Sequence, residues 1–143
     1  MNSLRIATIY TLLQFALGVG AGFILGILKR VVGLNHQWGA LDATAAIQLV
    51  TTAAIALGVF AAFAKRHPDR YYATGGIIVL LSAVLDVASA YLVAPQSARE
   101  TYAWGIAVID PLALNVAAFV ILGLFLRMRQ SSSNTSLERT RER

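Results

Sequence analysis

The sequence predicts an all-α integral membrane protein, a bundle of four transmembrane helices joined by short loops. Composition is the first reason, because 57% of the 143 residues are hydrophobic and only 13% are charged, whereas about a quarter of an ordinary soluble domain is charged. A chain this short could not hide so much apolar surface from water in a globule. The second reason is that the apolar residues gather in four stretches, each near the ~20 residues that a helix needs to cross a bilayer.

The four predicted spans are of similar length and are joined by short connections. Their approximate limits are residues 6–27, 43–64, 72–92 and 104–126. The first is longer than the roughly 7–15 apolar residues of a cleavable signal peptide, so we expect it to stay in the protein. Membrane barrels need strands of alternating hydrophobicity, and the four stretches do not alternate. Residues 1–129 are therefore expected to form one transmembrane domain, and the Ser-rich, charged residues 130–143 a disordered tail.

The distribution of basic residues predicts the orientation in the membrane. Four spans put both termini on one side, and nine of the 12 Lys and Arg residues lie on that side. The other side has Lys29, Arg30 and Arg99. Since cytoplasmic loops carry an excess of Lys and Arg, we expect a multi-pass protein of the cell membrane with cytoplasmic termini, although Lys29 and Arg30 directly after the first helix favour the reverse. Basic residues beside the spans would contact anionic lipid headgroups, so nucleic acid is not an expected partner.

A ridge of small residues runs along the first span. Gly18, Gly22 and Gly26 recur every four residues, and Gln14 extends the ridge by one turn. Such a ridge lets another helix backbone approach closely, so that dispersion holds the two helices together. The partner could be a second copy of the chain or another membrane protein. Alternatively, the ridge could pack inside one bundle against the Ala-rich second span. Gln14 itself is interpreted as a hydrogen-bonding residue between helices.

Polar residues within the spans are the main functional signal, because a carboxylate deep in lipid costs at least ~2.5–3.5 kcal/mol. The candidates are Gln48 in the second span, Ser82, Asp86 and Ser89 in the third, and Asp110 and Asn115 in the fourth. Ser82 and Ser89 share a helical face with Asp86. Gln48, Asp86 and Asp110 lie at a similar depth, ~21–24 Å from the inner ends of their spans at 1.5 Å per residue. They could therefore meet in one polar site.

Two interpretations of these carboxylates remain open. If Asp86 and Asp110 are close, they would not both ionise easily, and a shared proton or a bridging cation would be expected. Asp110 and Pro111 are also typical of a helix start, with Asp as N-cap and Pro in the first turn. The fourth helix would then begin at Pro111, instead of being a longer, kinked helix that begins at Trp104. Asp86 could equally be a hydrogen-bonding group that sets the register of its helix.

No residue pattern in the sequence indicates catalysis. The chain has no Cys, hence no thiol nucleophile and no Cys-based metal site, and it has no protease, hydrolase or phosphate-binding motif. His36 and His67 fall on opposite membrane faces in the predicted topology. We therefore expect no catalytic residue, metal or cofactor. The favoured function is a non-catalytic structural or accessory protein acting through helix–helix contacts, and the alternative is a small proton- or cation-coupled transporter or channel using Asp86 and Asp110.

Overall fold

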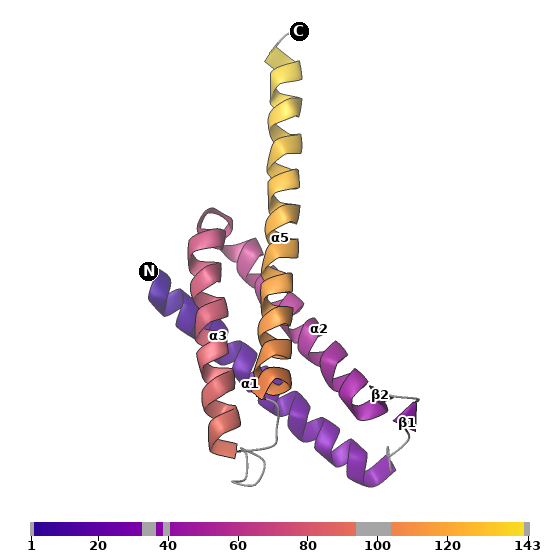
Figure 1. Ribbon diagram of the computed structural model, residues 1–143. Coiled ribbons are helices and arrows are strands. Elements are labelled where there is room, and N and C mark those ends of the chain that lie inside the picture. The colour runs from indigo at the N-terminus through magenta and orange to yellow at the C-terminus, as the bar shows by residue number, and fades with distance from the viewer. Residues whose placement is uncertain (1, 33–36, 39–40, 94–103, 142–143) are drawn as a thin grey trace.

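Four long helices form the body of the protein, in agreement with the predicted fold class (Figure 1). The computed structural model describes residues 2–32, 37–38, 41–93 and 104–141. Within these residues the long helices are α1 (Ser3–Val32), α2 (Ala43–Arg66), α3 (Tyr71–Val93) and α5 (Trp104–Arg141). The short antiparallel strands β1 (Gln37–Trp38) and β2 (Leu41–Asp42) lie between α1 and α2, and the 3-10 turn η1 (Pro68–Arg70) connects α2 to α3.

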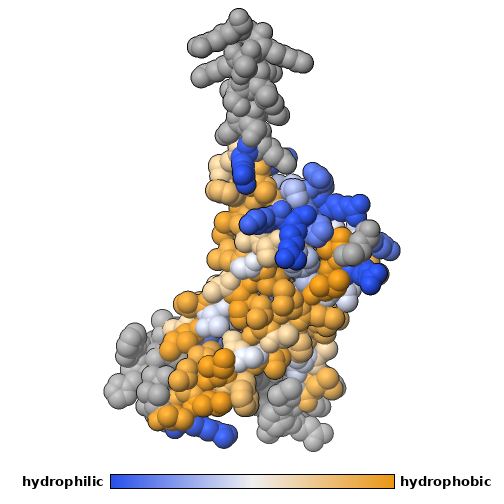
Figure 2. All heavy atoms as spheres, turned by 180° about the vertical axis from the view of Figure 1, so that it is seen from behind, coloured by the Kyte–Doolittle hydropathy of each residue, from blue (hydrophilic) through white to orange (hydrophobic). Residues whose placement is uncertain are grey.

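Each long helix contains a segment that is long and apolar enough to cross a membrane. These segments are Ser3–Leu28, Ala46–Arg66, Pro68–Ser89 and Pro111–Arg129. Only 11–28% of the residues in them are buried inside the protein, so most of their apolar side chains lie on the outside, where Figure 2 shows a largely hydrophobic surface. Phe23, for example, is 71% exposed. Such a surface is stable only against lipid, and the protein is a small polytopic membrane protein.

The helices are not arranged in sequence order around the bundle. α1 packs against α2 and α3, and α5 packs on the other side against the same two helices, whereas α2 and α3 meet mainly near their connection at η1. The order around the bundle is therefore α1, α3, α5, α2. This arrangement places α1 and α5, at opposite ends of the described chain, so that both contribute to the same interior.

An aromatic cluster joins the helices at the end of the bundle near η1. Tyr71 of α3 stacks on Phe119 of α5 with ring centroids 5.2 Å apart, and its hydroxyl donates to the Phe119 carbonyl oxygen at 2.8 Å. Phe63 of α2 lies 5.8 Å from Tyr71 and 5.2 Å from Tyr10 of α1. Because lipid removes the hydrophobic driving force between helices, close packing and hydrogen bonds of this kind hold a membrane bundle together.

Helix α5 decides between the two starts that the sequence left open for the fourth span. It begins at Trp104, with Pro111 inside it, so the longer helix is observed and the alternative start at Pro111 is not. Continuing the helix keeps the backbone groups before Pro111 paired where no water is available. At its other end α5 continues to Arg141 and projects beyond the bundle (Figure 1). The disorder expected for residues 130–143 stays a prediction.

The close packing at the aromatic cluster can be tested at Gly75. A Cβ atom added there would lie 2.6 Å from Cε2 of Phe119, and this ring cannot move freely because it stacks on Tyr71. We expect Gly75→Ala to lower the free energy of unfolding by about 1–3 kcal/mol. The adjacent Gly76→Ala places its Cβ in open space and should be neutral or stabilising by up to about 1 kcal/mol. Denaturant titration in mixed micelles measures both, and equal stabilities would contradict the packing.

Candidate functional site

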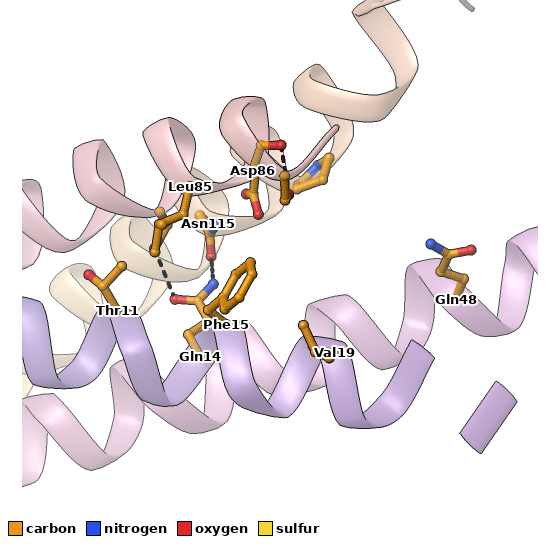
Figure 3. Close-up of a pocket in the computed structure, with 12 residues that line it drawn as sticks. Thr11, Gln14, Phe15, Val19, Gln48, Leu85, Asp86 and Asn115 are labelled. Carbon is orange, nitrogen blue, oxygen red and sulfur yellow. Dashed lines mark hydrogen bonds between the residues drawn. The ribbon is translucent and has the colours of Figure 1, made fainter. Parts of the chain in front are cut away.

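A partly open cavity of about 290 Å³ lies between the four long helices (Figure 3). All of these helices contribute polar side chains to it: Thr11 and Gln14 from α1, Gln48 from α2, Ser82 and Asp86 from α3, and Asn115 from α5. On every helix the lining residues lie farther from η1 than the aromatic cluster does. The cavity is therefore a separate, polar level of the bundle, next to a tightly packed one.

A hydrogen-bond network centred on Gln14 joins three helices beside the cavity. The Gln14 side-chain amide Nε2 donates to Oδ1 of Asn115, and Oγ of Ser82 donates to Oε1 of Gln14 at 3.3 Å. Asn115 is 2% exposed and Ser82 is 5% exposed, so these groups could not exchange their partners for water without moving. Buried polar side chains without partners are costly, and this network therefore sets how α1, α3 and α5 meet.

Asp86 is the charged residue that lines the cavity. Its side chain is half-buried and points from α3 toward the side where Gln14 and Asn115 lie (Figure 3). Ser89, which also lines the cavity, donates its hydroxyl to the backbone carbonyl of Asp86 at 3.0 Å and not to its carboxylate. Within the part of the chain that the structure describes, no hydrogen bond or ion pair to this carboxylate is found.

Thr11 is a cavity residue that the sequence did not single out. It is 2% exposed, and its hydroxyl has no hydrogen-bond partner among the described residues. A buried Thr in a helix usually bonds to the carbonyl four residues earlier, so an unpaired hydroxyl beside a cavity is unusual. The sequence did contain a signal, since Thr11 precedes Gln14 by three residues and hence shares its helical face.

The structure does not show the side chains of two predicted site residues, Gln48 and Asp110, together with those of Gln14, Asp86 and Asn115. Gln48 borders the cavity, but its side chain is exposed and lies apart from Gln14, Asp86 and Asn115 in Figure 3. Asp110 belongs to α5, but its side chain is outside the part of the structure that can be described. A close pair of Asp86 and Asp110 therefore stays a prediction.

The glycine ridge of α1 is not covered by the rest of the bundle. A Cβ atom added at Gly18, Gly22 or Gly26 would meet nothing within 4 Å among the described atoms. Gly18 borders the cavity, whereas the half-buried residues in the following turns are Ala21 and Leu25, which belong to a different face of the helix. Whether the ridge packs inside one bundle against α2 or against another chain is not decided by the described atoms, so both alternatives stay predictions.

The side chains around the cavity offer oxygen atoms that could bind a ligand. They provide one carboxylate, amide oxygens and hydroxyl groups, which are ligands of hard cations. Across the residues whose placement is described, no three His, Cys, Asp or Glu side chains come together. His67 lies at the η1 end between the rings of Tyr10 and Phe63, with centroid distances of 6.2 and 5.6 Å, and so belongs to the aromatic cluster.

Comparisons with known proteins provide no relative for this chain. Protein-family models, curated proteins and solved structures all give no match. The cavity and the uncovered face of α1 are therefore the two features from which a function can be argued.

The network around Gln14 can be tested with a double-mutant cycle. Gln14→Leu and Asn115→Leu each leave a polar partner unpaired, so we expect the two changes made together to destabilise by less than the sum of the single changes. The expected coupling free energy is about 0.6–1.7 kcal/mol, the range for interhelical hydrogen bonds in membranes. The control pairs Asn115→Leu with Gln48→Leu, which should be additive within about 0.5 kcal/mol. Equal coupling in both cycles, measured by denaturant titration, would contradict the network.

Proposed function

We propose that the protein is a non-catalytic accessory protein of a membrane, which acts by pairing with another transmembrane helix through α1. The uncovered glycine ridge carries this proposal. At Gly18, Gly22 and Gly26 the helix surface is open among the described atoms. Small residues at such positions let two helix backbones approach, which is the main source of attraction between helices in lipid.

Two glycines inside the bundle, Gly75 and Gly123, differ from those of the ridge, whereas Gly20, Gly58 and Gly76 are as open as the ridge is. At Gly75 an added Cβ would lie 2.6 Å from the Phe119 ring, and at Gly123 it would lie 3.1 Å from the ring of Tyr72. Inside the bundle, therefore, some glycines make room for a neighbouring side chain. Gly22 and Gly26 make the same kind of room without a neighbour, as expected if the neighbour belongs to another chain.

A second copy of the chain is the partner that fits this face most simply. A ridge of glycines flanked by large side chains, here Val19 at 58% and Phe23 at 71% exposure, offers both a groove and projecting residues. A two-fold axis brings the same face of both copies together. The groove of each copy can then receive the projecting side chains of the other. The pairing would bury part of the lipid-facing surface of α1, including Gly18 and Val19 at the edge of the cavity.

We also propose that the protein lies in the cell membrane with both termini on the cytoplasmic side. The N-terminus, η1 and the C-terminal part of α5 lie at the same end of the bundle (Figure 1). Basic residues gather at that end, namely Arg5, Lys65, Arg66, Arg70, Arg127 and Arg129, and hydrophilic residues appear there in Figure 2. Lys29 and Arg30 are the basic residues at the other end of the described helices. An excess of Lys and Arg favours the cytoplasmic side.

Pairing through α1 can be tested by cross-linking, because the chain has no Cys of its own. We expect Gly22→Cys and Gly26→Cys to form disulfide-linked dimers when membranes are mildly oxidised. Gly58→Cys is the matched control, since its added Cβ also meets nothing within 4 Å but lies on α2. Gly22→Leu should weaken dimerisation at least tenfold, about 1.4 kcal/mol, whereas Gly58→Leu should not. Equal cross-linking at the α1 and α2 positions would refute the pairing.

The orientation can be tested with a membrane-impermeant maleimide on intact cells. Val31→Cys lies just beyond the first span, where Val31 is 77% exposed, and we expect it to be labelled from outside. Asp69→Cys in η1 should be labelled only after the cells are opened, because η1 shares its end of the bundle with the basic residues. Labelling of Asp69→Cys alone in intact cells would show that the orientation is the reverse.

A further inference from the structure

The polar cavity holds a carboxyl group for which the described residues provide no partner. Asp86 lines it, is half-buried, and has no ion pair or hydrogen bond to its carboxylate in the described part of the chain. The basic residues of the described helices lie at or near the ends of the spans. A carboxylate within a bilayer is costly unless it finds a partner or a water-filled space, and such residues commonly mark ion or substrate sites.

The cavity has room for a small ligand together with water. Its volume of about 290 Å³ corresponds to several water molecules, each of which takes about 30 Å³ in the liquid. This volume is just below the range of about 300–1,000 Å³ that is usual for pockets binding drug-sized molecules. A single ion with a few waters, or an amine of one or two carbons, would fit.

Neutral oxygen atoms surround the carboxylate. Gln14 Oε1 and Asn115 Oδ1 each accept one hydrogen bond, which leaves each of them a second lone pair. Thr11 adds a buried hydroxyl that has no partner among the described residues, so a ligand would satisfy a group that is otherwise unpaired. Thr74 has a second unpartnered hydroxyl among the described residues but does not line the cavity, so the unpaired carboxyl group of Asp86 is the observation that indicates an occupant.

From these observations we infer that the cavity binds a small monovalent cation, with Asp86 supplying the charge and Thr11, Gln14 and Asn115 supplying neutral ligands. One carboxylate balances one positive charge. Sites for divalent ions usually combine several carboxylates, and the described residues contain no cluster of three acidic, His or Cys side chains. Alkali ions and small protonated amines share this charge and this preference for oxygen. The ridge reaches the cavity at Gly18, whereas Gly22 and Gly26 do not line it, so variants at these two positions test the pairing separately from the site.

The test measures the thermal stability of the purified full-length chain in detergent. Na⁺, K⁺ and methylammonium chlorides are titrated separately, with ionic strength held constant by the bulky cation N-methylglucamine. A cation that binds the folded state raises Tm in a saturable way, from which a dissociation constant follows. We expect at least one of the three to do so. Saturation by Na⁺ or K⁺ identifies an inorganic ion, and saturation by methylammonium alone identifies an organic amine.

Three variants separate the site from general effects of salt. Asp86→Asn keeps the size of the side chain and removes its charge, and it should raise the dissociation constant at least tenfold. Thr11→Val keeps the shape and removes the hydroxyl, and it should raise the constant about threefold or more. Asp69→Asn, in the exposed turn η1, removes the same charge elsewhere and should leave the constant unchanged. If Asp86→Asn does not fold, equilibrium binding of radioactive Na⁺ to the wild type and to Thr11→Val provides the second measurement.

Several results would overturn the inference. These are no saturable response to any of the three cations, an unchanged dissociation constant in Asp86→Asn, or tighter binding of Mg²⁺ or Ca²⁺ than of each monovalent ion. A stability that depends on pH but on none of the cations would mean that Asp86 simply carries a proton, and would also exclude the site. Gly22→Leu should keep the wild-type cation affinity, so failure of the pairing and failure of the cation site can be told apart.

Discussion

The constraint on which this structure depends is that the lipid interior offers no hydrogen bonds. A polar group inside the bundle has to find its partner within the protein, while an apolar side chain gains little by turning from lipid to protein. Most apolar side chains of the spans accordingly remain outside. The contacts that hold the helices in place are instead specific ones: the Tyr71 hydroxyl on the Phe119 carbonyl, the stacked rings around it, and the Gln14 amide on Asn115.

These contacts form two levels along the bundle, and the first positions the second. At the η1 end the Tyr71 hydroxyl bonds to the α5 backbone, as does that of Tyr72, which donates to the Gly123 carbonyl at 2.9 Å. Both bonds set the register of α3 against α5. Ser82, three turns farther along α3, is then brought to the same level as Asn115, one turn before Phe119 on α5. Gln14 of α1 can bond to both because that register is already determined.

Helix α1 has different roles along its length. Its first half carries buried residues of the core, such as Ile6, Ala7 and Tyr10, and then the two polar residues of the cavity, Thr11 and Gln14. Its second half has mostly exposed side chains and carries the glycine ridge. The proposed cation site and the proposed pairing surface therefore adjoin each other on one helix and share Gly18 and Val19. Gly22 and Gly26 lie outside the cavity lining, so variants at these two positions keep the two proposals experimentally separable.

Sequence alone was sufficient for the number and approximate limits of the spans, because the length of an apolar stretch needed to cross lipid depends only on helical rise and bilayer thickness. Helical periodicity likewise placed Ser82, Asp86 and Ser89 on one face, and the structure has all three beside the cavity. Periodicity relates residues of one helix only. That Gln14 bonds to Asn115, 101 residues away, and that Thr11 is buried with no hydrogen-bond partner among the described residues depend on how the helices are rotated and ordered around the bundle. The tertiary structure decided those points, because rotation and order follow from packing between helices and not from the pattern within any one of them.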